Sequence, residues 1–164
     1  MSDLAYSVEV AWVQSSLSRA WWFFSGERST FNYTPGPVGV LPFAEFSYFM
    51  PLTLATQTQR GGVGVFMQRG DAAEVAAYMF GVPRDQVDDA DLRDACAEVC
   101  NVLSDCITLQ FGAEQDVKMG LPLCGSATDY VFVAENSVSG AVYQESTGAR
   151  SLLIVLYDRL ILPN

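Results

Sequence analysis

The chain contains one long amphipathic stretch, Asp91-Leu-Arg-Asp-Ala-Cys-Ala-Glu-Val-Cys-Asn-Val-Leu-Ser-Asp-Cys-Ile-Thr-Leu109. On a period of about 3.6 residues, its polar side chains form one stripe and its apolar side chains line the opposite side. The stretch therefore predicts a half-buried helix with an open polar face. The polar stripe comprises Asp94, Glu98, Asn101 and Asp105, and the apolar side comprises Ala95, Val99, Val102, Leu103 and Cys106.

Glu98 and Asn101 are three residues apart in this stripe. On a helix that spacing makes them neighbours, roughly 5–6 Å apart at Cβ, so both can enter one small pocket on a partner. The other interpretation is that they are ordinary polar residues facing water, which is the commoner outcome for such side chains. The pair is therefore a candidate site whose role depends on the rest of the chain.

The length of 164 residues fits one domain, long enough to bury roughly 68–70% of the surface of its unfolded chain. We take residues 1–164 as a single domain, with an N-terminal helix and loop over residues 1–44 and a core over residues 45–164. The start of the chain lacks the pattern of a signal peptide, and no apolar run reaches the roughly 18 residues of a membrane span. We expect a cytoplasmic protein that does not interact with membranes and has reduced thiols.

Charge and residue types exclude several classes of function. The 19 acidic and 9 basic residues give a formal charge of −10, and the chain lacks the clustered lysine and arginine that bind nucleic-acid phosphates. The absence of histidine removes the Ser-His-Asp and Cys-His triads and the HExxH zinc motif. Any chemistry must therefore use carboxylates, amides, thiols, hydroxyls or groups supplied by a partner.

Three of the four cysteines, Cys96, Cys100 and Cys106, fall on the predicted helix, without a CxxC pair, and Cys124 follows later. A thiol or metal protein built on the first three is one interpretation, but no compact set of four ligands is visible. Small apolar residues buried in the core account better for these thiols. We expect no metal site.

Turn and periodicity signals divide the rest of the chain into short elements. Helices are predicted over residues 4–24 and over residues 71–80, the latter capped by Asp71 and ended by Gly81. Acidic residues from Asp88 onward suit the cap and first turn of the helix over residues 91–109.

Strands are expected between these helices and after them. This layout predicts an α+β fold, an antiparallel sheet with two long helices on one face and an additional N-terminal helix. Loops or turns are predicted at residues 34–37, 60–62 and 145–148, and β segments at residues 45–59, 63–67, 130–134, 139–144 and 151–157.

Five blocks, in their order and spacing, resemble the CheX branch of the CheC/CheX/FliY chemotaxis phosphatases. The order carries the resemblance, because a Glu-x-x-Asn tetrapeptide alone occurs on the order of once per few chains. The resemblance runs from about residue 61 to residue 157. The blocks are Gly61-Gly-Val-Gly-Val-Phe-Met67, Asp71-Ala-Ala-Glu-Val-Ala-Ala-Tyr-Met-Phe-Gly81, Asp94-Ala-Cys-Ala-Glu-Val-Cys-Asn101, Leu121-Pro-Leu-Cys-Gly125 and a closing antiparallel pair around Gly148.

The resemblance implies a phosphatase that hydrolyses the phospho-aspartate of a CheY-like response-regulator receiver domain. Asn101 would position the attacking water, and Glu98 would contact the receiver's active-site lysine or neighbouring polar groups. The receiver would supply Mg²⁺ and its acidic ligands, so the chain would need no cofactor of its own. Proteins of this family are often homodimers through their sheets, which makes a homodimer plausible here.

Departures from the family pattern define the alternative. Ser104 and Asp105 stand where the family often has glycine, which adds a side chain and a charge where a partner would pass, and Asp94 lies at the rim of the same face. We assign these three residues to partner contact, and the alternative function is a non-catalytic receiver-binding or signalling adaptor. A second Glu-x-x-Asn is missing, since Ala77 stands three residues after Glu74, which favours a single site.

Overall fold

An antiparallel sheet forms the middle layer of the structure, a computed structural model that describes residues 8–36, 38, 45–54, 59–112, 116–147 and 150–160. Within these residues the sheet has seven strands in the order β1-β6-β7-β3-β2-β4, with β5 also paired to β2. Every pairing is antiparallel. The strands are β1 Phe31–Pro35, β2 Phe46–Leu54, β3 Gln59–Met67, β4 Val117–Met119, β5 Leu123–Cys124, β6 Ser137–Glu145 and β7 Leu153–Leu160.

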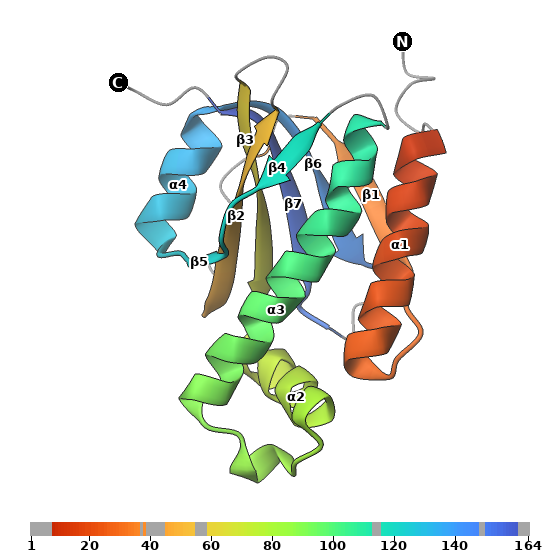
Figure 1. Cartoon of the computed structure of the whole chain (residues 1–164), viewed down its shortest axis with the longest axis vertical. Helices are drawn as coiled ribbons and strands as arrows, with labels where there is room; N and C mark the ends of the chain where they lie inside the picture. Colours follow the sequence, from red (N-terminus) through yellow and green to blue (C-terminus); the bar gives the residue numbers. More distant parts are fainter. Residues whose placement is uncertain are drawn as a thin grey trace.

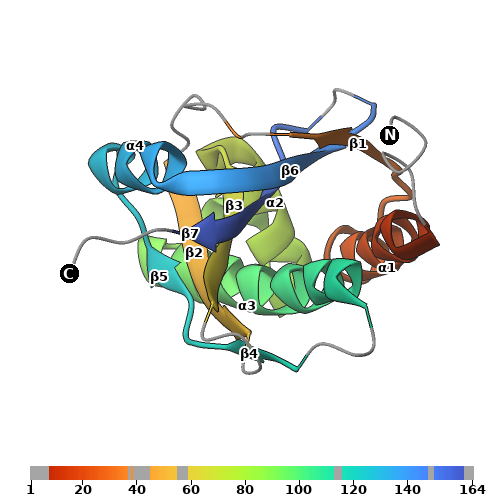
Figure 2. The ribbon, with the colours of Figure 1, turned by 90° about the horizontal axis from the view of Figure 1, so that it is seen from above.

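Two long helices, α1 (Val8–Ser25) and α3 (Asp89–Thr108), cover one face of the sheet (Figure 1). Figure 2 shows the shorter α4 (Ala127–Glu135) on the other side. The helix α2 (Arg69–Phe80) packs against α1 and α3 beyond one end of the sheet. The predicted α+β class is confirmed. Short 3₁₀ turns, η2 Arg84–Gln86 and η3 Leu109–Phe111, flank α3.

The core lies on both faces of the sheet, because successive side chains of a strand point to opposite sides. In β7, Ile154 and Leu156 join the large cluster that includes the buried rows of α1 and α3. Val155 and Tyr157 join a smaller cluster with Tyr130 of α4. The part of this central strand from Leu153 to Tyr157 is therefore apolar at every position. In the described part of the chain, no helix is both long and apolar enough to cross a membrane.

The predicted hairpin is present as β2 and β3, but residues 60–62 lie inside β3 and not in a turn. Its glycines allow close approach of neighbouring groups. A Cβ added to Gly61 would lie 2.8 Å from the carbonyl oxygen of Tyr157, and one added to Gly62 would overlap the ring of Phe49. The turn prediction was wrong because adjacent glycines here serve close packing in a strand.

Gly61→Ala is expected to lower the free energy of unfolding by about 1–3 kcal/mol, because the new methyl group meets backbone of β7 that cannot move without disturbing the sheet. Urea unfolding at neutral pH measures this change. Gly120→Ala is the matched control, since its Cβ would meet only the Pro51 ring at 3.5 Å or more. Equal stabilities of the two variants would contradict the packing of β3 against β7.

Residues 130–134 were predicted to form a strand and lie in α4 instead. The helix begins with a capping box: the Ser126 hydroxyl accepts from the backbone N of Asp129 at 3.2 Å, and the Asp129 carboxylate accepts from the backbone N of Ser126 at 2.9 Å. The short apolar run that follows does not separate strand from buried helix by period alone, whereas the Ser-x-x-Asp cap does indicate a helix.

The segment at residues 34–37 was predicted to be a loop, but Thr34 and Pro35 end β1, which pairs with β6. Proline is tolerated there because β1 lies at an edge of the described sheet, where one side of the strand needs no hydrogen-bond donor. Pro37 lies outside the described residues, as do residues 4–7 of the predicted N-terminal helix. Pairing of two copies through a sheet edge stays a prediction.

Asp71 was predicted to cap α2, but it lies in the first turn of that helix and is not its cap. Its carboxylate accepts from the backbone N of Ser151 at 2.8 Å and from the Ser151 hydroxyl at 2.5 Å, and it pairs with Arg150 at 3.0 Å. Arg150 also pairs with Glu27 and Glu74. This group of charges fixes α2 and the segment after α1 to the connection between β6 and β7.

Candidate functional site

The helix α3 is fixed at its start by a capping box, as its acidic beginning predicts. The Asp88 carboxylate accepts from the backbone N of Asp91 at 2.8 Å, and the Asp91 carboxylate accepts from the backbone N of Asp88 at 3.2 Å. Buried side chains on the opposite side then set the rotation of the helix on the sheet. They are Leu92, Ala95, Cys96, Val99, Cys100, Leu103, Ser104, Cys106 and Ile107.

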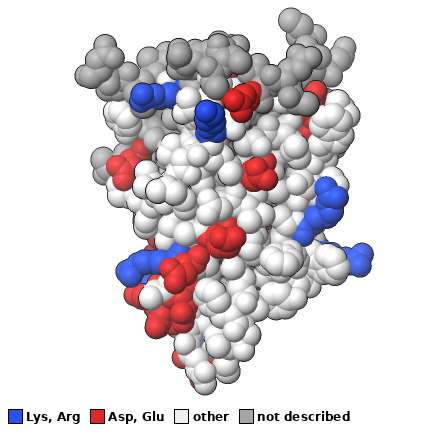
Figure 3. Space-filling model, viewed as in Figure 1, with Lys and Arg blue, Asp and Glu red and all other residues white. Residues whose placement is uncertain are grey.

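This rotation places the predicted polar stripe on the outside of the molecule. Asp94, Glu98 and Asp105 are exposed, and Asn101 is half-buried between them in the stripe. The helix crosses the front of the sheet in Figure 1, and in Figure 3 acidic side chains gather over its N-terminal half. The predicted exposure of the Glu98/Asn101 face is confirmed.

The Glu98 carboxylate and the Asn101 amide form no hydrogen bond or ion pair with any other residue in the described part of the chain. An amide that lacks an internal partner keeps both a donor and an acceptor for an external group. The helix therefore fixes the backbone positions from which the two side chains project, and both side chains are open to a partner. Their roles stay predictions.

The glutamate at the corresponding place in α2 behaves differently. Glu74 pairs with Arg84 at 3.2 Å and also with Arg150. Ala77 follows it where α3 has an amide. Glu74 is therefore part of the structural ion-pair group. Of these two glutamates, Glu98 is the one that is available to a partner.

Ser104 does not lie on the polar face, and its assignment to partner contact is corrected. Its side chain is completely buried, and its Oγ lies 3.8 Å from the Cys100 Sγ. Six residues after Glu98, a helix has turned by roughly 240°, which carries Ser104 to the flank that packs on the sheet. Asp105 is exposed, as expected, and keeps its place beside Asn101.

The three cysteines of α3 are buried, which agrees with their predicted role in packing. Desolvation raises the pKa of Cys96 and of Cys100 to about 12 and also raises the pKa of Cys106. These groups stay protonated thiols at neutral pH and are poor nucleophiles and metal ligands. Among the described residues, no group of three or more histidine, cysteine, aspartate or glutamate side chains is placed to hold a metal.

Two leucines of the β4–β5 segment are exposed, Leu121 to 78% and Leu123 to 55%. Leu123 pairs with Phe49 and lines a hollow with Tyr130 of α4, so it lies on the face of the sheet opposite α3. Beside the polar stripe, Trp12 of α1 is 50% exposed. The Ser16 hydroxyl, one turn from Trp12, lies 3.1 Å from the Cys106 Sγ and fixes α1 against α3. Exposed apolar side chains beside a polar face are typical of a protein-binding surface.

Comparison with protein-family models finds no match, and comparison with curated proteins finds none either. Solved structures do match. A chemotaxis protein CheX from Desulfovibrio desulfuricans is 13% identical, with a TM-score of 0.63 over 90% of this chain and 97% of that one. A CheC-like superfamily protein from Shewanella sp. PV-4 is 12% identical, with a TM-score of 0.67 over 92% of this chain and 97% of that one.

A third match is a chain of the CheX–CheY–BeF3–Mg²⁺ complex from Borrelia burgdorferi. It is 13% identical, with a TM-score of 0.64 over 92% of this chain and 97% of that chain. At these identities the matches establish the fold, which is CheC/CheX-like over most of the chain. The resemblance found in the sequence is therefore confirmed at the level of the fold.

Proposed function

We propose that this chain, which has the CheC/CheX-like fold, hydrolyses the phospho-aspartate of a CheY-like response-regulator receiver domain. One observation carries the proposal: Glu98 and Asn101 stand one helical turn apart on the outer face of α3, without a partner among the described residues. In a fold with several CheX-like neighbours, this face is suited to entering the active site of another protein.

The chemistry is an in-line displacement at phosphorus. A water oxygen forms the new bond to phosphorus while the bond from phosphorus to the aspartyl oxygen breaks, which releases inorganic phosphate and the free carboxylate. The Asn101 amide can hold this water, because its carbonyl oxygen accepts and its NH₂ group donates. Catalysis of phosphoryl transfer depends mainly on positioning the reactants and on electrostatic stabilisation of the transition state, so a chain without histidine can accelerate it.

The receiver completes the site in this proposal. Its bound Mg²⁺ neutralises charge on the phosphoryl oxygens, and its acidic ligands and lysine belong to the same cleft. The carboxylate of Glu98 pairs with that lysine or with neighbouring donors and so orients α3. We propose that Asp94 and Asp105, at the rim of the stripe, influence the rate and orientation of docking more than the chemistry.

The choice of partner has one further support. The Borrelia burgdorferi structure that matches this fold contains CheX together with CheY, BeF3 and Mg²⁺. By analogy, a CheY-like receiver is the partner of the α3 face here. The exposed Trp12 of α1, the helix that contacts α3 through Ser16, offers an apolar contact of the kind that protein partners use.

The alternative is an adaptor that binds a receiver without hydrolysis. The exposed Asp105, four residues after Asn101, favours it, because a carboxylate near the attacked phosphoryl group repels that group. Ser104 no longer supports the alternative, since it is buried. The two functions differ in one observable quantity, the lifetime of the phosphoryl group in the complex.

The proposal predicts that at least one Mg²⁺-loaded phosphorylated receiver from the same cell loses phosphate faster when the chain is added. Release of inorganic phosphate, measured over a panel of such receivers, tests it. A heat-denatured sample of the chain is the control for buffer effects. If every receiver in the panel keeps its unassisted lifetime, the phosphatase proposal is rejected.

A further inference from the structure

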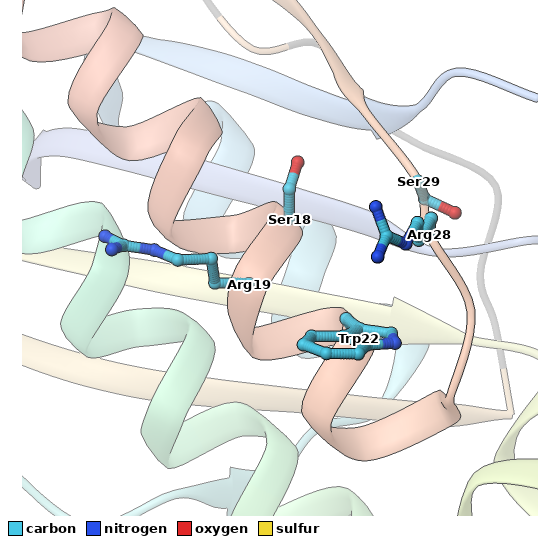
Figure 4. Close-up of a pocket in the computed structure, with 5 residues that line it drawn as sticks. All are labelled: Ser18, Arg19, Trp22, Arg28 and Ser29. Atoms are coloured by element: carbon cyan, nitrogen blue, oxygen red, sulfur yellow. The ribbon is translucent and has the colours of Figure 1, made fainter.

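A shallow hollow of about 280 Å³ lies against the C-terminal half of α1, away from the α3 stripe. In Figure 4 the Arg28 guanidinium lies near the Trp22 ring, whereas the Arg19 side chain extends away from that ring toward α3; none of the described lining residues is a carboxylate. Cationic, hydroxyl and aromatic residues thus line one hollow in a chain with a formal charge of −10. The lining residues are Ser18, Arg19, Trp22, Arg28 and Ser29.

Arg28 is already oriented in this hollow. Its guanidinium carbon lies 5.5 Å from the centroid of the Trp22 ring, within the range of a cation–π contact. A guanidinium held over a ring keeps its in-plane N–H groups free, and those groups match the two oxygens of a phosphate. Because the ring restricts the side chain, part of the entropy cost of binding an anion is already met.

The charges around the hollow favour an anion. Neither Arg19 nor Arg28 forms an ion pair with another described residue, whereas Arg69 and Arg84 do. Glu27 is the carboxylate next to Arg28 in the sequence, but it pairs with Arg150. Figure 3 shows basic side chains at the α1 edge, apart from the acidic ones over α3.

The hollow also offers an aromatic surface. Trp22 is 53% exposed, so a large part of its indole ring faces solvent, and the Arg28 guanidinium lies beside it. A lone carboxylate or phosphate would use the arginines and leave this ring uncovered. A ligand that joins a planar ring to a phosphate would use both, and bases commonly stack on aromatic side chains and on guanidinium planes.

We propose that this hollow binds a mononucleotide. The Arg28 guanidinium donates to the phosphate, the hydroxyls of Ser18 and Ser29 donate to the phosphate or the ribose, and the base packs on the exposed part of the Trp22 ring. Arg19, which in Figure 4 extends toward α3, adds a second positive charge at the rim. The volume is at the low end for small-molecule sites, which limits the ligand to a single nucleotide unit. This site is independent of the phosphatase proposal.

Calorimetric titration of the full chain with AMP, GMP, adenosine and inorganic phosphate tests the proposal. At least one mononucleotide is expected to bind about tenfold more tightly than either adenosine or inorganic phosphate, since each of these makes only half of the contacts. Arg28→Gln and Trp22→Leu are each expected to weaken nucleotide binding about tenfold or more. The matched controls are Trp12→Leu, at a tryptophan with 50% exposure, and Arg93→Gln, at an exposed arginine of α3. Neither control should change the affinity.

Three outcomes would overturn the assignment. If inorganic phosphate binds as tightly as the nucleotides, the aromatic part of the site has no role. If nucleotides bind to Arg28→Gln and Trp22→Leu as tightly as to the wild-type chain, they occupy another site. If none of the four compounds binds, the hollow is not a ligand site. Phosphate release from a receiver involves none of these side chains, so these results leave the phosphatase proposal unaffected.

Discussion

We expect Asn101→Ala to abolish the acceleration of receiver dephosphorylation while the chain stays folded. The expected loss is about a hundredfold or more, because in the proposed mechanism the amide positions the attacking water and alanine cannot hold it. Phosphate release from a receiver that responds to the wild-type chain measures the effect. The fold is expected to survive, since alanine has a higher helix propensity than asparagine and the amide has no internal partner among the described residues.

Two further variants separate chemistry from folding. Asn101→Asp keeps the size of the side chain but removes the donor and adds a charge, so it should lose about as much activity as Asn101→Ala. Thr108→Ala is the matched control, because Thr108 is also half-buried and lies two turns further along the same helix. Full activity in Asn101→Ala, with the circular dichroism of the wild type, would rule out the assigned role.

Arg150→Met is expected to have the largest effect on stability, a loss of about 3 kcal/mol in the free energy of unfolding at neutral pH. The substitution leaves Asp71, whose side chain is 13% exposed, without its cation, and it also releases Glu27 and Glu74. Arg93→Met is the control, since Arg93 is exposed and has no ion pair among the described residues. It should change stability by no more than about 0.5 kcal/mol.

The effect of Arg150→Met depends on pH in a defined direction. Burial raises the pKa of the Asp71 carboxyl, but hydrogen bonds from Ser151 and the charge of Arg150 outweigh it, so the pKa lies below its ordinary value. A lowered pKa means that the carboxylate stabilises the fold above the unfolded-state pKa of about 4, and that this stability is lost as the pH falls through the folded-state pKa. The gap between wild type and variant in urea unfolding should therefore be full at pH 7 and narrow below about pH 4. A gap that stays constant with pH would contradict the ion-pair explanation.

The α3 helix was predictable because several local signals agree. The Asp88/Asp91 cap and the period of the apolar row together define where the helix begins and which side is buried. The exposure of Glu98 follows from the same period. Ser104 was misplaced because it was assigned from its position in the family pattern, where glycine is common, and not from its angular position, which lies on the packed flank.

The remaining errors come from contacts between distant segments. Nothing near Gly61 in the sequence indicates that the carbonyl oxygen of Tyr157 lies against it, so two glycines inside a strand looked like a turn. Asp71 resembles a helix cap, but its hydrogen bonds go to Ser151, 80 residues later. The hollow at Trp22 and Arg28 also depends on the fold, which diverts Glu27 to Arg150.

The lifetime of the phosphoryl group on a receiver saturated with this chain tests the central claim most directly. A single-turnover experiment uses a receiver with a labelled phosphoryl group and a rising excess of the chain. It separates binding from hydrolysis, because the rate of phosphoryl loss reaches a plateau when all of the receiver is bound. The account predicts a plateau at least about a hundredfold above the unassisted rate for wild type and close to the unassisted rate for Asn101→Ala. A saturated complex in which the wild-type chain leaves the phosphoryl lifetime unchanged would contradict it and would leave an adaptor in place of an enzyme.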